Sequence, residues 1–126
     1  MEKHVFAAPD GAPAVGPYSA AVGVGDFVFV SGQIALDPDG KIHGYLPKEQ
    51  AQKALENLQA VLAAADLTLD NVVKTTIFLK SMEEFGAVNE VYGRFFKEPY
   101  PARSTVEVAR LPKDVLVEIE AIAYRG

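Results

Sequence analysis

The stretch VLVEIEAIAY, residues 115–124, alternates apolar side chains with other side chains and predicts a β-strand. One face of this strand carries small and branched apolar residues, at Val117, Ile119, Ala121 and Ala123. The other face is mixed and carries Leu116, Glu118, Glu120, Ile122 and Tyr124. The first face suits packing against helices. The second face is half apolar, and with no helix left to cover it we expect it to meet another subunit.

Further strand-like segments lie on both sides of two helical patterns. Strands are expected at residues 19–24, 27–31, 72–80 and 104–108, with a short one at 41–43. Gly25-Asp26 between the first two predicts a two-residue hairpin turn, because glycine supplies the positive φ. A second turn is expected at residues 37–40, and residues 7–17, rich in Ala, Gly and Pro, should be irregular.

The two helices follow from apolar residues that recur at intervals of three and four. Pro47 suits the first position of a helix, and one apolar stripe follows it, at Ala51, Ala54, Leu55, Leu58, Val61 and Leu62. Residues 81–84 (SMEE) form a capping-box pattern that opens the second helix. Its expected buried stripe is Phe85, Val88, Tyr92, Phe95 and Phe96. We therefore predict a single α+β domain over residues 1–126, with one sheet and both helices on one of its faces.

Composition excludes several classes of function. The 126 residues include no cysteine, which removes disulfides and thiolate ligands, and neither His4 nor His43 has a companion at ligand spacing, so no metal site is expected. Twelve basic against 17 acidic residues give a net charge of −5, which argues against nucleic-acid binding. No membrane span or secretory signal is apparent, so a cytoplasmic protein with a small-molecule site is the default expectation.

Two carboxylates on the last strand could carry chemistry. Glu118 and Glu120 share one strand face and lie about 7 Å apart. Residue statistics favour a solvated pair, or a pair bound to Lys or Arg. A face that meets another subunit weakens that interpretation, because unpaired carboxylates are costly to bury.

Four other residues are candidates with ordinary alternatives. Arg103 at a strand entrance, on one face with Thr105, could bind a carboxylate through two parallel hydrogen bonds, although a surface arginine is commoner. Ser31 ends a strand and could line a pocket. Asn89 falls within the expected buried stripe, so its amide should tie down a nearby loop rather than contact a ligand. Tyr18 fits a core position or a pocket wall equally well.

Seven short motifs occur in one order along the chain, and together they resemble the Rid family, the reactive intermediate deaminases also called YjgF or RidA-like proteins. They are GPYS (16–19), FVSGQ (29–33), VKTT (73–76), VNEVY (88–92), PARS (101–104), VEVARLP (106–112) and VEIEA (117–121). The resemblance implies a mixed sheet with two helices on one side, similar to Bacillus chorismate mutase. It also implies a homotrimer whose sheets form a central barrel, with active sites in the clefts between subunits.

The same resemblance implies an activity. Rid proteins hydrolyse 2-imino acids and their enamine tautomers, 2-aminoacrylate and 2-aminocrotonate, to 2-keto acids and ammonia without a cofactor. Arg103 matches the family's carboxylate-binding arginine, and Glu118, fifteen positions later, matches its catalytic acid. The remaining pocket positions correspond to Tyr18, Ser31, Gly32, Asn89 and Thr105. Many relatives carry cysteine at position 105; the backbone carbonyl there can still orient water.

Two other functions compete with this expectation. The same cleft could bind 2-keto acids without catalysis, making the trimer a sensor or a partner-binding module. An endoribonuclease or translation inhibitor is the second alternative, and the acidic balance counts against it.

Overall fold

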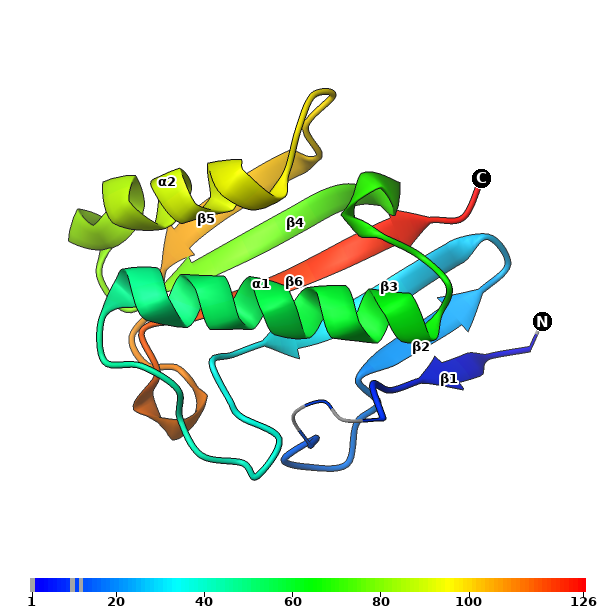
Figure 1. Ribbon diagram of the computed structural model, residues 1–126, viewed down its shortest axis with the longest axis horizontal. Coiled ribbons are helices and arrows are strands. Elements are labelled where there is room, and N and C mark those ends of the chain that lie inside the picture. Colours follow the sequence, from blue (N-terminus) through cyan, green and yellow to red (C-terminus); the bar gives the residue numbers. More distant parts are fainter. Residues whose placement is uncertain (1, 10, 12) are drawn as a thin grey trace.

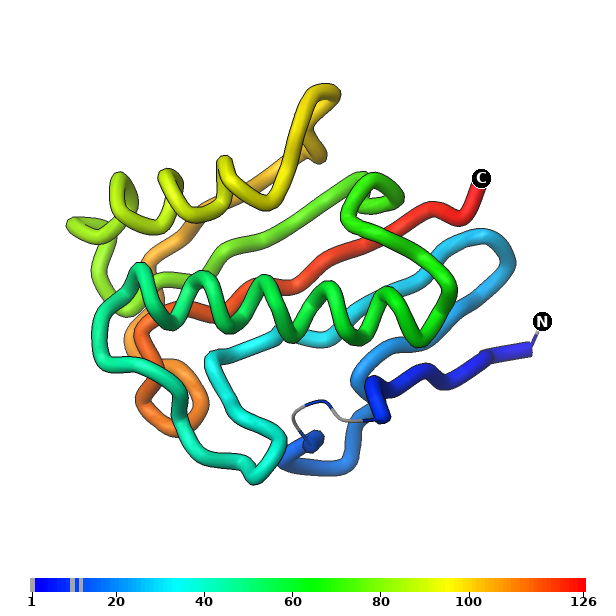
Figure 2. Tube along the Cα trace, in the orientation of Figure 1, coloured from blue at the N-terminus to red at the C-terminus, as the bar shows by residue number. Residues whose placement is uncertain are grey.

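Six strands form one mixed sheet in the order β1-β2-β3-β6-β4-β5, shown in Figure 1. The computed structural model describes residues 2–9, 11 and 13–126. The strands are β1 (His4–Phe6), β2 (Ala21–Val24), β3 (Phe27–Gln33), β4 (Val72–Leu79), β5 (Ala102–Glu107) and β6 (Val117–Tyr124). Only β4 and β5 are parallel. The C-terminal strand β6 runs through the middle of the sheet, between β3 and β4 (Figure 2).

Two helices, α1 (Pro47–Ala64) and α2 (Phe85–Phe95), cover one face of this sheet (Figure 1). The α1 stripe predicted from the sequence is confirmed: its six apolar residues are at most 5% exposed. Against them pack the four apolar residues of β6 that alternate along the strand, Val117, Ile119, Ala121 and Ala123, each at most 3% exposed. The fold class predicted from alternation and helical periodicity is therefore confirmed. None of the described helices has the length and apolarity needed to cross a bilayer.

The expected strand at residues 41–43 is absent. This segment makes only one isolated bridge, between Leu36 and Ile42, within a loop that runs from β3 to α1. Gly40 N–H closes the predicted turn onto the carbonyl of Asp37 at 2.8 Å, and the chain then turns away before a ladder can form. The hairpin at Gly25-Asp26 is confirmed, with Gly25 at φ +58°.

The N-terminal segment adds a strand that the sequence did not indicate. β1 pairs antiparallel with β2 at the edge of the sheet. Its three residues are too few to show a period, so only the tertiary pairing defines it. In the segment 7–17 the described residues form no helix or strand, while residues 10 and 12 lie outside the described part of the chain.

The second helix begins later than its capping signal suggests. Ser81 accepts a hydrogen bond from Glu83 N–H, but it caps a single 3₁₀ turn, Met82–Glu84, and α2 follows at Phe85. The N–H of Met82 is bound by Glu107 Oε1 of β5 at 2.7 Å, which fixes this junction to the sheet edge. Phe85 is 39% exposed, so its assignment to the buried stripe was wrong, whereas Val91 is buried.

No helix among the described residues covers the second face of the sheet. Phe27, Phe29, Val106 and Tyr124 are each at least 40% exposed there, and Glu118 and Glu120 project from the same side of β6. Phe27 and Tyr124 form an aromatic pair, with ring centroids 5.1 Å apart. This surface, which we call the open face, is the one that the alternation of residues 115–124 left without a partner.

Candidate active site

The candidate residues fall into two groups on opposite faces of the sheet. Arg103 and Thr105 of β5 pair in parallel register with Thr75 and Ile77 of β4, which are buried beneath the helices. Glu118 of β6 is paired with Phe78, on the open face. Within one subunit, the sheet therefore lies between Arg103 and Glu118.

Arg103 lies on an aromatic platform. Its guanidinium carbon is 4.8 Å from the ring centroid of Tyr92 and 5.6 Å from that of Phe85, both on α2. The Tyr92 hydroxyl is hydrogen-bonded to Thr75 Oγ1 at 2.8 Å, within the core. The ring is thus held at both ends, and cation–π attraction fixes the stem of Arg103 without using its hydrogen-bond donors.

A cleft beside this platform brings Arg103 together with a second predicted residue. It is lined by Asn89, Tyr92, Gly93, Tyr100, Pro101 and Arg103. Thr105 and Phe85 line a smaller neighbouring hollow that also has Asn89 and Arg103 in its wall. A planar guanidinium and an amide at the wall of an open cleft suit recognition of a carboxylate.

Asn89 does not play the part expected from the helical pattern. Its side chain is exposed on α2 and ties down no loop, because the helix turns Val88, Val91 and Tyr92 inward instead. A shift of one residue in the buried stripe is enough to move Asn89 from the core into the cleft. The amide is therefore available to a ligand beside Arg103.

Glu118 lies against the backbone of β3. A β-carbon on Gly32 would meet Glu118 Oε2 at 2.0 Å and Cδ at 2.6 Å, so any larger residue would displace the carboxylate from this position. The pairing of β3 with β6 shifts register between Val30 and Gln33, which places Gly32 at the irregularity. The role of Gly32 in this site is thus to admit the side chain of Glu118.

The environment of Glu118 raises the pKa of its carboxyl above the ordinary glutamate value. Desolvation by burial is the larger cause, and the negative charge of Glu120 adds to it. Within the described part of one subunit neither carboxylate forms an ion pair, and Glu120 is exposed, as the solvated alternative requires of it. A carboxyl with a raised pKa is suited to exchanging protons near neutral pH.

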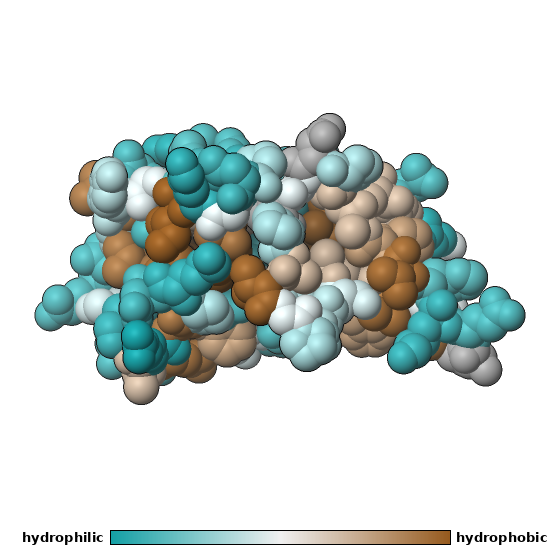
Figure 3. Space-filling view, turned by 90° about the horizontal axis from the view of Figure 1, so that it is seen from below, coloured by the Kyte–Doolittle hydropathy of each residue, from teal (hydrophilic) through white to brown (hydrophobic). Residues whose placement is uncertain are grey.

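A pocket gathers Glu118 with two other predicted residues, Tyr18 and Gly32. We call it the Glu118 pocket; its other lining residues are Pro13, Ala14, Val15, Ala20, Gln33, Ile34, Leu36 and Pro112. Tyr18 is 48% exposed and its hydroxyl accepts a hydrogen bond from Val15 N–H, so it is a pocket wall and not a core aromatic. Figure 3 views the molecule from below the orientation of Figure 1 and shows hydrophobic residues lying between hydrophilic ones on that side.

Ser31 lies beside the Glu118 pocket. Its hydroxyl donates to the carbonyl of Ser19 at 2.6 Å, and it borders a hollow of the open face with Phe29, Glu120 and Ile122. This bond holds the end of the segment that carries Tyr18.

Two residues of the arginine platform were missed as site residues. Tyr92 and Phe85 both read as core positions of an amphipathic helix, and periodicity cannot separate a buried ring from a ring that carries a cation. Arg103 on the neighbouring strand could have indicated that these rings carry a cation. Using that signal would have required knowing how α2 lies against β5. In the described residues there is no group of three His, Asp or Glu side chains able to hold a metal ion.

The chain is thus a small α+β domain with an open sheet face, an arginine cleft and, on the opposite face of the sheet from that cleft, a half-buried carboxylate. The family model described as Endoribonuclease L-PSP matches residues 9–125. The chain belongs to this family, also known as the Rid or YjgF family.

Relatives are similar along the whole chain. A RutC family protein of Pyrococcus abyssi is 48% identical over 126 residues, covering 99% of both chains. The crystal structure of RidA from an Antarctic Psychrobacter is 41% identical with a TM-score of 0.92, covering 96% of this chain and 98% of that one. The crystal structure of Escherichia coli TdcF with bound serine is 43% identical with a TM-score of 0.91, covering 98% and 99%.

Proposed function

We propose that the protein hydrolyses 2-imino acids, and the 2-aminoacrylate and 2-aminocrotonate enamines that equilibrate with them, to 2-keto acids and ammonia. The observation that carries this proposal is the presence in one chain of two complementary groups: Arg103 on its aromatic platform and Glu118 with its raised pKa. The first suits the carboxylate of such a substrate, and the second suits the proton transfers of its hydrolysis. Membership of a family that includes RidA supports the same activity.

We further propose that the working molecule is a homotrimer. Arg103 and Glu118 lie on opposite faces of one subunit, and the open face carries exposed aromatic side chains. Packing three open faces around an axis would bury those side chains in a central barrel. Each active site would then combine the Arg103 cleft of one subunit with the Glu118 pocket of its neighbour.

The reaction needs little beyond placement and proton transfer. Water attacks C2 of the iminium while Glu118 takes one of its protons, and the C=N electron pair moves to nitrogen. Glu118 then gives that proton to the amine. The hydroxyl proton returns to Glu118 as the carbonyl forms and the C–N bond breaks, and the released ammonia takes it as ammonium. Glu118 ends as it began, and one water has been consumed.

The other residues hold the reactants in this arrangement. Arg103 binds the substrate carboxylate through a planar fork, and Asn89 lies next to it for a further hydrogen bond. Thr105 supplies its backbone carbonyl for the attacking water. Tyr18 closes the side of the pocket where the imine nitrogen would lie, while Ser31 and Gly32 provide the strand end against which Glu118 rests.

The test is to generate 2-aminoacrylate with a pyridoxal-phosphate serine dehydratase and to follow pyruvate release, with the spontaneous rate in buffer as baseline. Wild type should accelerate release. Glu118→Gln should lower kcat about 10²- to 10⁴-fold, whereas Glu120→Gln is the matched control and should stay within a few-fold. No acceleration by wild type would overturn the proposal.

Calorimetry with 2-oxobutyrate separates catalysis from binding alone. A trimer that binds this 2-keto acid and leaves the rate of pyruvate release unchanged would be a sensor or binding module, the function to which the serine-bound TdcF structure lends support. RNA cleavage that survives Glu118→Gln would favour the endoribonuclease activity for which the family is named, although a net charge of −5 opposes RNA binding.

A further inference from the structure

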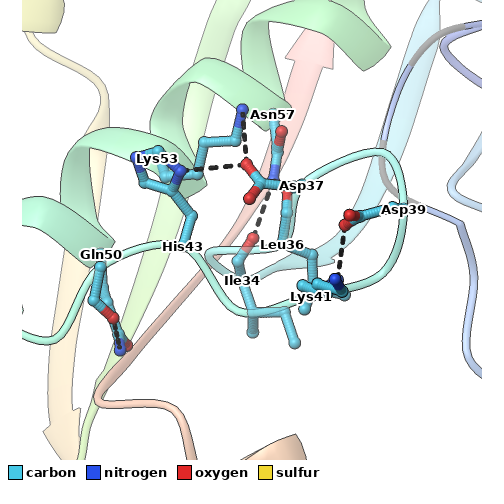
Figure 4. Close-up of polar contacts among 10 residues, drawn as sticks. Ile34, Leu36, Asp37, Asp39, Lys41, His43, Gln50, Lys53 and Asn57 are labelled. Atoms are coloured by element: carbon cyan, nitrogen blue, oxygen red, sulfur yellow. Dashed lines mark hydrogen bonds and ion pairs between the residues drawn. The ribbon is translucent and has the colours of Figure 1, made fainter.

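Two buried amides on α1 face the loop between β3 and α1, which we call the 34–46 loop. Gln50 is 4% exposed and Asn57 is 7% exposed, on a helix whose other inward residues are apolar. With Lys53, which lies 3.8 Å from Asp37, they form a polar edge of the helix along the loop (Figure 4). The loop pairs with itself at the Leu36–Ile42 bridge, and the carbonyls of Leu36 and Gly44 accept hydrogen bonds from side chains of α1.

Asn57 secures the first part of this loop. Its Nδ2 donates to the carbonyl of Ile34 at 2.9 Å and to that of Leu36 at 3.0 Å, as Figure 4 shows. Ile34 and Leu36 line the Glu118 pocket. One side chain therefore fixes the backbone of two residues in the wall opposite the carboxylate.

Gln50 secures the other end of the loop and the approach to Glu118. Its Nε2 donates to the carbonyl of Gly44 at 3.1 Å, and its Oε1 accepts from Leu116 N–H at 2.7 Å. Leu116 lies two residues before Glu118, in the bend that leads into β6. The single amide thus links α1, the loop and the beginning of the strand that presents the carboxylate.

Packing alone gives no reason for these amides. Apolar residues at positions 50 and 57 would extend the buried stripe of α1 without the desolvation cost of an amide. The two amides nevertheless make four hydrogen bonds to backbone groups, namely the carbonyls of Gly44, Ile34 and Leu36 and the N–H of Leu116. Ile34 and Leu36 lie in the wall of the Glu118 pocket, and Leu116 lies two residues before Glu118.

We propose that Gln50 and Asn57 are positioning residues for the Glu118 pocket, holding its wall and the approach to its carboxylate in the geometry the reaction needs. This inference rests on the proposed function for its kinetic consequence. The lining of the Arg103 cleft comes from α2, β5 and the residues just before β5, and includes no residue of this polar edge of α1. A disturbed wall should therefore impair the proton transfers and spare the binding of the substrate carboxylate.

The experiment compares Gln50→Met and Asn57→Leu with Gln59→Met, which makes the same kind of change at an exposed position of α1. Gln50→Met and Asn57→Leu should lower kcat for 2-aminoacrylate about 10- to 100-fold, because small misplacements of reacting groups cost this much. The Kd for 2-oxobutyrate should stay within about threefold, and Gln59→Met should match wild type in both.

A second readout is the pKa of the Glu118 carboxyl, measured by NMR of the labelled side chain. Tyr18 is the only other titratable residue among the described residues that line the pocket, and Glu120 is the nearest charge on the strand. A loosened wall admits water, so the pKa of Glu118 should fall toward its ordinary value in both inner variants and stay constant in Gln59→Met.

The two readouts separate the two proposals. If wild type proves inactive on the imine, the proposed function fails, and a lowered Glu118 pKa in the inner variants still supports the positioning role. Unchanged kcat and unchanged Glu118 pKa in folded Gln50→Met and Asn57→Leu would overturn that role and leave the amides with a purely structural one. Loss of 2-oxobutyrate binding in step with kcat would also contradict it.

Discussion

Glu118 occupies an environment that favours its neutral form, and this lowers the free energy of unfolding at neutral pH. Burial and the adjacent Glu120 raise the pKa of its carboxyl, so at neutral pH the folded state holds a charge that it disfavours. The unfolded chain carries no such penalty. The native state therefore gains stability as pH falls through the raised folded pKa toward the unfolded value, and loses that increment as pH rises again.

Glu118→Gln should consequently stabilise the protein while removing its proposed activity. At pH 7 the free energy of unfolding in urea should exceed that of wild type, because the glutamine is never charged. The difference should vanish below the unfolded glutamate pKa, where Glu118 is neutral as well. Lower stability of Glu118→Gln at pH 7 would mean that the carboxylate has a favourable partner in the folded protein.

Arg103→Lys tests the need for a planar cation at the cleft. Lysine keeps the charge but offers a point donor and stacks poorly on Tyr92. Losing a bidentate contact should cost about 2–3 kcal/mol, or roughly 30- to 150-fold in kcat/KM for 2-aminoacrylate. Arg94→Lys, at an exposed position of α2 that pairs with Glu90, is the control and should have little effect. Near wild-type efficiency of Arg103→Lys would remove the fork from the mechanism.

For individual residues, the sequence indicated which ones carry the site but not which side chains surround them in the fold. Arg103 and Glu118 were identified through the family's register, which fixes their identity and spacing. Asn89 was misplaced because helical periodicity tolerates a shift of one residue, and that shift separates core from cleft. Gln50 and Asn57 carry no local signal, since three of their four backbone partners lie 21 to 66 residues away.

Helix α1 ends in a Schellman motif, and its left-handed position is occupied by Asp66, where glycine would be less strained. Asp66 N–H bonds to the carbonyl of Ala63 and Leu67 N–H to that of Leu62, with Asp66 at φ +60°. Asp66→Gly should therefore raise the free energy of unfolding by about 0.5–1 kcal/mol, because glycine adopts this conformation without strain. Ala65→Gly, one residue earlier at φ −98°, should destabilise the protein instead. Urea titrations of both variants check the pair.

Elements with a strong local pattern were predictable, and those defined by pairing were not. α1, the Gly25-Asp26 hairpin and β6 follow from periodicity and turn chemistry. β1 has only three residues, and its position is set by its antiparallel pairing with β2 at the edge of the sheet. The parallel pairing of β4 with β5 was likewise beyond the pattern, because it depends on how α2 crosses between them.

For the whole molecule, the open face should govern assembly. Light scattering after size exclusion should give three times the mass of the chain. Phe29→Asp places a charge among exposed aromatic and apolar residues of that face and should yield monomers or a strongly weakened trimer. Gln59→Asp, on the exposed side of α1, should leave the mass unchanged. A wild-type monomer at micromolar concentration would refute the shared site.

The separation of Arg103 and Glu118 onto opposite faces of the sheet makes inactivation complementable. Arg103→Ala and Glu118→Gln would each give a dead homotrimer. If the two dead proteins are unfolded together and refolded as an equal mixture, a cleft drawn from two neighbours has about a one-in-four chance of receiving the intact arginine and the intact carboxylate. About a quarter of wild-type activity should return from two inactive parents. A cleft contained in one subunit would return none, so the recovered rate reports which chains build each site.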